Sequence, residues 1–231
     1  ANSGLGFAAT KLFARKGAHV VMACRNLDRA RTAQEEVRSS LGEPSLSVLE
    51  LDLADLESVR SFVTAFEQGH DDLHVLCNNA GIMAIPRRET ADGFEMQFGV
   101  NHLGHFALTG LLIDRLQETS GESGLHENGE IEFEDLQSER DYDKWEAYAQ
   151  SKLANLLFAY ELDRRLRDLG ASVKSVGCHP GYADTALQQR GPEMSGSRIR
   201  LWGMKIANRL FAQSAEQGVL PMLYAATAPE I

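Results

Sequence analysis

Short apolar runs of strand length alternate with segments of helical periodicity through most of this chain. The candidate strands are the runs 19–24, 46–51, 73–77 and 172–178. The helical period is clearest after Asp55, where apolar residues recur at 56, 59, 62, 63 and 66. Strands that alternate with helices form a parallel sheet covered by helices on both faces. We therefore predict an α/β fold, and a length of 231 residues fits a single domain. The other predicted helices follow Gly6 and span about 27–41, 101–117, 146–169 and 215–227.

Ligands bind to such sheets beyond the carboxyl ends of the strands, and Gly6, Arg25, Asp52 and Asn79 all fall at such positions. The turn 2–6 (Asn-Ser-Gly-Leu-Gly) opens a helix, whose first N–H groups are suited to bind phosphate. Arg25 lies about 20 residues farther on, where a dinucleotide site contacts the adenosine ribose. An arginine there suits the 2′-phosphate of NADP. A solvent-exposed arginine at a strand end is an equal alternative for this residue alone.

Tyr148 and Lys152 form a second motif, a phenol and an ammonium group at helical spacing. Residues four apart share one face of a helix, with Cβ atoms about 5–6 Å apart. A neighbouring ammonium group stabilises a phenolate, so we expect the pKa of Tyr148 to fall below its usual value of about 10. Such a phenol serves as a general acid or base near neutral pH. The alternative is an ordinary pair on an amphipathic helix, because this spacing also recurs by chance.

Composition argues against several classes of function. A net charge of −10 argues against a nucleic-acid partner. No run of about 18 apolar residues is present, and no signal peptide is visible, so we predict a cytoplasmic protein without a membrane span. Cys24, Cys77 and Cys178 are too far apart in the sequence for a chelating pair. His102 and His105 lack a third ligand, and we predict no metal site.

Taken in order, these motifs resemble the classical short-chain dehydrogenase/reductase family, and within it the retinol dehydrogenase-like branch. The resemblance extends along essentially the whole sequence, and its motifs are specific by their order and spacing although each is weak alone. It implies a three-layer, doubly wound Rossmann-type parallel sheet in one domain over residues 1–231. Its carriers are Asn2-Ser-Gly-Leu-Gly6, Ala23-Cys-Arg-Asn26, Asp52-Leu53, Asn78-Asn-Ala-Gly81, Asn101, Tyr148-x-x-x-Lys152 and His179-Pro-Gly181.

The resemblance implies a role for each matching residue. Tyr148 is the general acid/base, Lys152 lowers its pKa and binds the nicotinamide ribose, and Asn101 anchors a water in the proton relay. The implied cofactor is NADP, with NAD as the weaker candidate, and Arg25 holds the 2′-phosphate. The other cofactor-binding positions are Ser3, Gly4, Leu5 and Gly6 at the pyrophosphate, then Asn26, then Asp52 and Leu53 at the adenine, Asn79, Ala80 and Gly81 beside the ribose, and Pro180, Gly181 and Thr185 at the nicotinamide.

Three strands of the family sheet have no counterpart here: the first, the fifth, which ends in the catalytic serine, and the last. Unpaired backbone groups in a core cost about 1–3 kcal/mol each, so we expect these segments to be missing from the sequence rather than from the folded protein. Ser123 precedes Tyr148 by 25 positions (123 to 148), close to the spacing in the retinol dehydrogenase-like branch. If the missing segment ends just before Ser123, then Ser123 is the catalytic serine. If the missing segment begins just after Ser123, the catalytic serine is lost and Ser123 is a loop residue. We take the first.

The resulting hypothesis is an NADP-dependent oxidoreductase that interconverts an alcohol and a carbonyl group on a small apolar substrate. Apolar residues between 199 and 211 belong to a predicted substrate lid at about 186–213, or else to the core. A non-catalytic nucleotide-binding or regulatory protein on the same scaffold is the competing hypothesis, and reduction of a carbon–carbon double bond is a third. The resemblance also implies a homodimer or homotetramer that packs the helices around 101–117 and 146–169.

Overall fold

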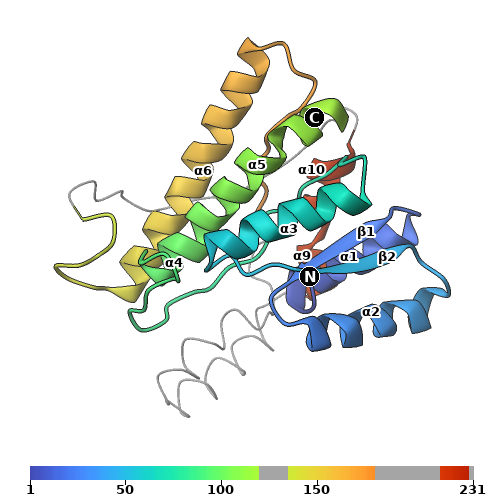
Figure 1. The fold of residues 1–231 in the computed structure, drawn as a ribbon, viewed down its shortest axis with the longest axis horizontal. Coiled ribbons are helices and arrows are strands. Elements are labelled where there is room, and N and C mark those ends of the chain that lie inside the picture. Colours follow the sequence, from blue (N-terminus) through green and yellow to red (C-terminus); the bar gives the residue numbers. More distant parts are fainter. Residues whose placement is uncertain (120–134, 180–213, 229–231) are drawn as a thin grey trace.

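The computed structural model describes residues 1–119, 135–179 and 214–228. Its first half alternates helices and strands as predicted: α1 (Gly4–Arg15), β1 (Val20–Cys24), α2 (Leu27–Leu41), β2 (Leu46–Glu50) and α3 (Leu56–Gly69). β1 and β2 are parallel, with Val20 opposite Leu46. α2 and α3 lie on opposite sides of this strand pair (Figure 1). This part of the chain therefore has the α/β arrangement expected from the alternating pattern.

The side chains of β1 explain why both faces of the strand pair are covered. Met22 packs with Ala30 and Ala33 of α2. Val21 and Ala23 pack on the other side, against the apolar cluster around α3. Successive residues of a strand face opposite sides. A strand that is apolar throughout is therefore buried on both faces.

Two predicted strands are absent from the described residues. The segments 73–77 and 172–178 are not strands, and the sheet found in the described part of the chain is the pair β1–β2. An extended segment becomes a strand only when a neighbour pairs with its N–H and C=O groups. The strands that we expect beside these two segments are among the three family strands that have no counterpart in the sequence. Local sequence pattern cannot replace that pairing.

α3 confirms the helical pattern that follows Asp55. The Asp55 carboxylate accepts hydrogen bonds from the N–H groups of Glu57 and Ser58, which caps the helix start. Gly42, with a φ of 85°, ends α2 as predicted. Four of the five apolar side chains of this pattern are buried and Leu56 is half-buried; the buried four are Val59, Phe62, Val63 and Phe66.

The second half contains α4 (Met96–Phe98), the π-helical turn η1 (Gly99–Leu103), α5 (Gly104–Thr119), α6 (Lys144–Asp168), α9 (Ala215–Gly218) and α10 (Leu220–Thr227). The sequence predicts one helix over 215–227, but the structure breaks it at Val219. Pro221 lies in the first turn of α10. Because proline has no N–H group, it cannot continue the hydrogen bonds of α9. Both short helices pack on α1.

α6 buries a different face from the one predicted. The leucine pattern predicts a buried side formed by Leu153, Leu156, Leu157, Tyr160 and Leu166. Leu166 is buried, but Leu157 and Tyr160 are 49% and 63% exposed. The buried face consists mainly of small residues, among them Ala147, Ser151 and Ala154. Small side chains let α6 lie close to η1 and α4, which it contacts along this face.

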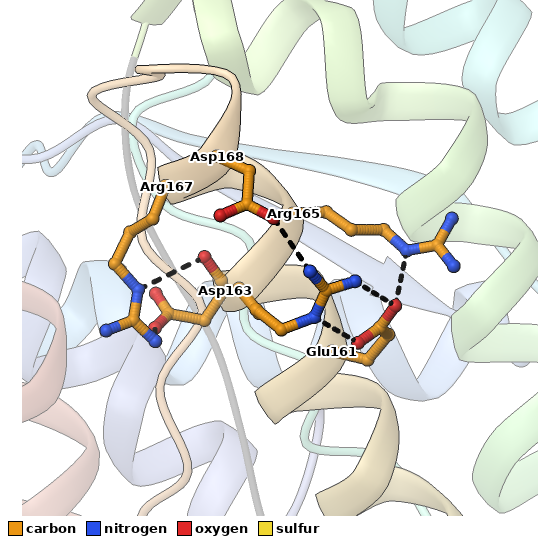
Figure 2. Close-up of polar contacts among 6 residues, drawn as sticks. Glu161, Asp163, Arg165, Arg167 and Asp168 are labelled. Atoms are coloured by element: carbon orange, nitrogen blue, oxygen red, sulfur yellow. Dashed lines mark hydrogen bonds and ion pairs between the residues drawn. The ribbon is translucent and has the colours of Figure 1, made fainter.

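Ion pairs hold the last turns of α6 (Figure 2). Arg164 lies 2.8 Å from Glu161 and 2.7 Å from Asp168, and Arg165 lies 2.6 Å from Glu161. Hydrogen bonds from Arg164 and Arg165 lower the pKa of Glu161 to about 2. Opposite charges three or four residues apart support an exposed helix end. No helix among the described residues is both long enough and apolar enough to cross a membrane.

Gly104 begins α5 directly against the backbone that follows β2. A Cβ atom at this position would lie 2.5 Å from the carbonyl oxygen of Leu53 and 3.0 Å from its Cβ. We expect Gly104→Ala to lower the free energy of unfolding by about 1–3 kcal/mol, because the clash displaces α5. An added Cβ at Gly110 of the same helix meets no atom within 4 Å. Gly110→Ala should stabilise the protein by about 0.5–1 kcal/mol. Urea unfolding of both variants checks the pair, and a Gly104→Ala protein as stable as the wild type would contradict the close packing.

Candidate active site

Tyr148 and Lys152 lie four residues apart on α6, as the sequence predicts. Asp143 sets the start of this helix, because its carboxylate accepts hydrogen bonds from the N–H groups of Trp145 and Glu146. The Nζ atom of Lys152 lies 5.6 Å from the centre of the Tyr148 ring. The phenol and the ammonium group are therefore neighbours in the fold.

Burial determines the pKa of this phenol. It raises the pKa of Tyr148 above its ordinary value, so the lowered pKa predicted from the sequence is wrong. The anionic form of a buried phenol loses solvation by water, which disfavours it. Burial also lowers the pKa of Lys152 to about 8. The ammonium group that should stabilise the phenolate thus loses its own charge more readily.

The lowered pKa of Lys152 makes the stability of the fold depend on pH. Between the folded pKa of about 8 and the ordinary value of 10.5, the unfolded chain keeps a proton on this lysine that the folded protein releases. The free energy of unfolding should therefore rise with pH in this window, by at most about 1.4 kcal/mol per pH unit from this group. Lys152→Met removes the contribution. Urea unfolding at a series of pH values checks it, and wild-type and Lys152→Met curves that stay parallel through the window would contradict it.

Asn101 joins the loop after residue 78 to α6. It is fully buried in η1. Its Oδ1 accepts a hydrogen bond from the Ile82 N–H at 2.8 Å, and its Nδ2 donates to the Ile82 carbonyl and to Ser151 Oγ, both at 2.9 Å. Its backbone carbonyl accepts a hydrogen bond from Asn155 Nδ2 at 2.8 Å. Sequence reasoning assigned no role to Ser151 or Asn155. Both follow Tyr148 at helical spacing, three and seven residues later, on the side of α6 that meets η1.

Gly81 brings this loop close to Lys152. A Cβ atom at Gly81 would lie 3.2 Å from Asn101 Oδ1 and 3.7 Å from Lys152 Nζ. A larger side chain would therefore occupy the space beside both groups, which glycine leaves open. The resemblance implies the ribose of a dinucleotide beside this loop, and the space that Gly81 leaves open fits such a group.

The glycine turn contacts the same loop. A Cβ atom at Gly6 would lie 3.0 Å from Asn79 Nδ2. Gly4 has a φ of 54°, in the left-handed region that glycine adopts without strain. The start of α1, with its free N–H groups, thus lies beside the loop that also reaches Lys152. The first N–H groups of a helix are suited to bind a phosphate.

Arg25 and Asp52 mark the carboxyl ends of β1 and β2. Arg25 Nη1 lies 3.8 Å from Asp52 Oδ2, and the Arg25 side chain is 66% exposed. The other Asp52 oxygen accepts a hydrogen bond from the Ala54 N–H at 3.0 Å. An exposed guanidinium group is therefore held at the sheet edge, where it can pair with a phosphate.

The remaining predicted positions have mixed surroundings. Asn26 caps α2, with its side-chain oxygen accepting from the Arg29 N–H at 2.8 Å. Leu53 is a core residue, and Leu5 packs in the cluster around α1. Ser3 precedes α1 without a side-chain capping bond, and Ala80 is exposed. The predicted residues that lie outside the described ranges are Ser123, Pro180, Gly181, Thr185 and the lid at about 186–213.

The two histidines of this region have different environments. His102 Nδ1 forms a hydrogen bond with Asn155 Oδ1 at 3.0 Å. His105 is buried, and neither of its ring nitrogens has a hydrogen-bond partner in the described part of the chain. Within the same residues, no group of three or more His, Cys, Asp and Glu side chains is placed to hold a metal ion. The sequence predicts only polar helix histidines here. The spacing of four residues from Asn101 is the one sequence feature that indicates a position for His105 on the same helix side as Asn101.

Comparison with known proteins identifies the family. The short chain dehydrogenase family matches residues 1–195. The chain belongs to this family. Human retinol dehydrogenase 11 is 40% identical over 232 residues, covering 98% of this chain and 70% of the relative. Human polyprenol dehydrogenase is 36% identical over 242 residues, covering 99% and 71%. The predicted resemblance to the retinol dehydrogenase-like branch is confirmed.

Solved structures confirm the Rossmann-type α/β fold. A Mycobacterium Paratuberculosis protein has a TM-score of 0.75 with 40% identity, covering 98% of this chain and 74% of that one. A Sphingobium yanoikuyae short-chain dehydrogenase in complex with NADPH has a TM-score of 0.68 with 19% identity, covering 96% and 80%. A Burkholderia phymatum short-chain dehydrogenase/reductase in complex with NAD has a TM-score of 0.72 with 19% identity, covering 97% and 83%. At 19% identity the likeness shows the fold alone.

Proposed function

We propose that this member of the short-chain dehydrogenase family is an NADP-dependent oxidoreductase that interconverts an alcohol and a carbonyl group on a small apolar molecule. One observation carries the proposal. The loop 79–81 lies against the glycine turn at Gly6 and also against Lys152, the neighbour of Tyr148. The same loop thus connects the turn that we propose binds phosphate with the proposed acid–base pair.

Each residue has a defined task in the proposed reaction. Tyr148 gives its proton to the carbonyl oxygen in reduction and removes the proton from the alcohol in oxidation. Lys152 holds the ribose, and its charge stabilises the phenolate. Gly4 and Gly6 admit the pyrophosphate, Arg25 pairs with the 2′-phosphate, and Ser123 orients the substrate oxygen. NADP, when bound, supplies or accepts the hydride.

The choice of cofactor and substrate rests on two further observations. The exposed guanidinium group of Arg25 at the end of β1 favours a 2′-phosphate, and with it NADP over NAD. Retinol and polyprenol, which the names of the two human relatives contain, are both apolar alcohols. These names support an apolar substrate for this chain.

A cofactor titration followed by a substrate series tests the proposal. The purified protein is titrated with NADPH and with NADH, and NADPH consumption is then followed with aldehydes of increasing apolar chain length. We expect tighter binding of NADPH and turnover that rises with chain length. A folded protein that binds neither nucleotide would overturn the proposal. One that binds NADPH but reduces no carbonyl compound would favour a non-catalytic nucleotide-binding role.

We also propose that the protein forms a homodimer through α5 and α6, which lie side by side (Figure 1). Phe106, Leu157 and Tyr160 on these helices are 52%, 49% and 63% exposed. Phe106 contacts Phe158 with ring centres 5.2 Å apart, which joins the two helices into one apolar surface. Exposed apolar patches of this kind mark interaction sites.

Leu157→Glu is expected to weaken this dimer. A charge in the apolar interface should raise the dimer dissociation constant at least about tenfold, equivalent to 1.4 kcal/mol. Leu169→Glu, at the end of α6 where the leucine is 76% exposed, is the matched control and should leave assembly unchanged. Light scattering over a concentration series checks both variants. A wild type that stays monomeric throughout would contradict the proposed dimer.

A further inference from the structure

The backbone is strained in two segments that adjoin the candidate active site. Among the described residues, Ala84 and Ser138 are the non-glycine residues with a positive φ, at 51° and 50°. Such backbone is disfavoured for side chains other than glycine and persists only where surrounding contacts hold it. Ala84 lies in the loop 79–85, three residues after Gly81, and Ser138 lies in the segment 135–143 that leads into α6. We therefore examined which contacts join the two segments.

Gln97 connects the loop to α6 from a buried position in α4. Its side chain is 0% exposed. Its Oε1 accepts a hydrogen bond from the Ala84 N–H at 2.7 Å, and its Nε2 donates to the Lys144 carbonyl at 2.9 Å. These partners fix the orientation of the amide, because one is a donor and the other an acceptor. Lys144 begins α6 one helical turn before Tyr148. Gln97 thus joins the loop 79–85 to the helix that carries the proposed acid–base pair.

Tyr142 and Glu95 extend this connection. The Tyr142 hydroxyl accepts a hydrogen bond from Gln97 Nε2 at 2.8 Å. It donates toward the Ile85 carbonyl at 3.0 Å and toward Glu95 Oε1 at 3.2 Å. The other Glu95 oxygen accepts a hydrogen bond from the Phe98 N–H at 2.7 Å. Burial and the charge of Glu95 raise the pKa of Tyr142 above its ordinary value, so the hydroxyl keeps the proton that it donates.

Buried polar networks of this kind define one arrangement of the segments that they join. Glu95 and Gln97 are both 0% exposed, and the four polar atoms of their side chains all have hydrogen-bond partners. A fully satisfied network is rigid, whereas removal of one member leaves its buried partners unpaired. Rigidity matters at an acid–base site, because a displacement of about 1 Å can lower a rate by about a hundredfold.

We propose that Gln97, Glu95 and Tyr142 form a clamp that fixes the start of α6 against the neighbouring loop. The clamp sets the position of Tyr148 relative to the loop 79–85, which also contacts the glycine turn. Its members are positioning residues that act through Tyr148. This inference rests on the proposed function, since it concerns the same acid–base site. It adds three residues that lie outside the motifs on which the family resemblance is based.

Gln97→Met tests the clamp, because methionine keeps the length of glutamine and removes both polar ends. We expect kcat for carbonyl reduction to fall by about ten- to a hundredfold. NADPH affinity should change little, since the glycine turn and Arg25 are untouched. Glu95→Gln is the conservative variant. It keeps an acceptor for the Phe98 N–H and gains a donor toward the Tyr142 oxygen, so it should retain kcat close to that of the wild type.

Val37→Ala is the matched control for lost stability. Val37 is fully buried in α2 and packs with Ala14 and Leu46. Its truncation should lower the urea midpoint of unfolding and leave kcat unchanged. A folded Gln97→Met protein with the kcat of the wild type would overturn the clamp. So would an equal loss of kcat in Val37→Ala, because general destabilisation would then explain both results.

Hydrogen–deuterium exchange on the full-length protein provides a test that requires no turnover. In Gln97→Met we expect faster exchange in peptides over 79–85 and 135–150, with the exchange of α2 unchanged. In Val37→Ala we expect the reverse. Unchanged exchange of both segments in Gln97→Met would refute the clamp. A wild type that binds no NADPH or reduces no carbonyl compound would overturn the proposed function, and the exchange data would still decide whether the clamp exists.

Discussion

Replacing Tyr148 with phenylalanine is expected to lower kcat by about 10²–10⁴-fold, the usual contribution of a general acid or base. Phenylalanine keeps the ring in its place on α6, 5.6 Å from Lys152 Nζ. It removes only the hydroxyl group that transfers the proton. NADPH affinity should change little, because the glycine turn, the loop 79–81 and Arg25 are untouched.

The raised pKa of Tyr148 makes this prediction specific. At physiological pH the phenol is protonated, because burial disfavours its anion. It is therefore ready to act as the acid in carbonyl reduction, whereas alcohol oxidation needs the phenolate. We expect the loss of kcat in Tyr148→Phe in both directions, and in the wild type the oxidation rate should rise with pH well past neutrality.

Tyr160→Phe provides the matched control. Tyr160 lies on the same helix, is 63% exposed and is not part of the site, so its variant should have wild-type kcat and KM if assembly is maintained. Steady-state kinetics with NADPH and an apolar aldehyde compare the three proteins. If Tyr148→Phe retained turnover close to that of the wild type, the acid–base role of this tyrosine would have to be abandoned.

Arg25→Ala should produce the second large effect, a loss of NADPH affinity of about ten- to a hundredfold. Hydrogen bonds to charged groups contribute about 1.5–3 kcal/mol, and the 2′-phosphate would lose its guanidinium partner. NADH carries no 2′-phosphate, so its affinity should stay the same or rise slightly. The variant also frees one oxygen of Asp52, which Arg25 contacts at 3.8 Å in the wild type.

Arg31→Ala is the control for net charge. Arg31 lies on α2, pairs with Asp28 and is 67% exposed, so its loss changes the charge of the protein as much as Arg25→Ala does. Fluorescence titration of NADPH and NADH on the three proteins gives the comparison. Equal losses in both variants would mean that general electrostatics, not a contact at Arg25, favours NADPH. Equal losses of NADPH and NADH in Arg25→Ala alone would mean that the arginine supports the fold of the site.

The helices were predictable from sequence because their signals are local. Asp55 lies immediately before α3 and caps it through its own neighbours Glu57 and Ser58. Gly42 ends α2 with a positive φ that few other residues adopt. The Tyr148–Lys152 pair is equally local, since a helix places residues four apart on one face. The order of the motifs then indicated the family without any structural information.

The strands and the buried faces were not predictable in the same way. Segments 73–77 and 172–178 have the composition of strands, but a strand also needs a partner from elsewhere in the chain. On α6 the leucine pattern suggested a core face, yet the helix buries Ala147, Ser151 and Ala154 against η1. Close approach to a neighbouring helix favours small residues over large apolar ones, and sequence periodicity alone does not contain that information.

The family, the alternating α/β arrangement and the identity of the chemical groups can all be derived from the amino-acid sequence. Each of these depends on residue type and short-range spacing. The environment of these groups depends on the tertiary structure: the burial that raises the pKa of Tyr148, the loop that joins Gly6 to Lys152, and the burial of His105. Solvation and hydrogen-bond satisfaction depend on which distant segments meet, and that is a property of the folded chain.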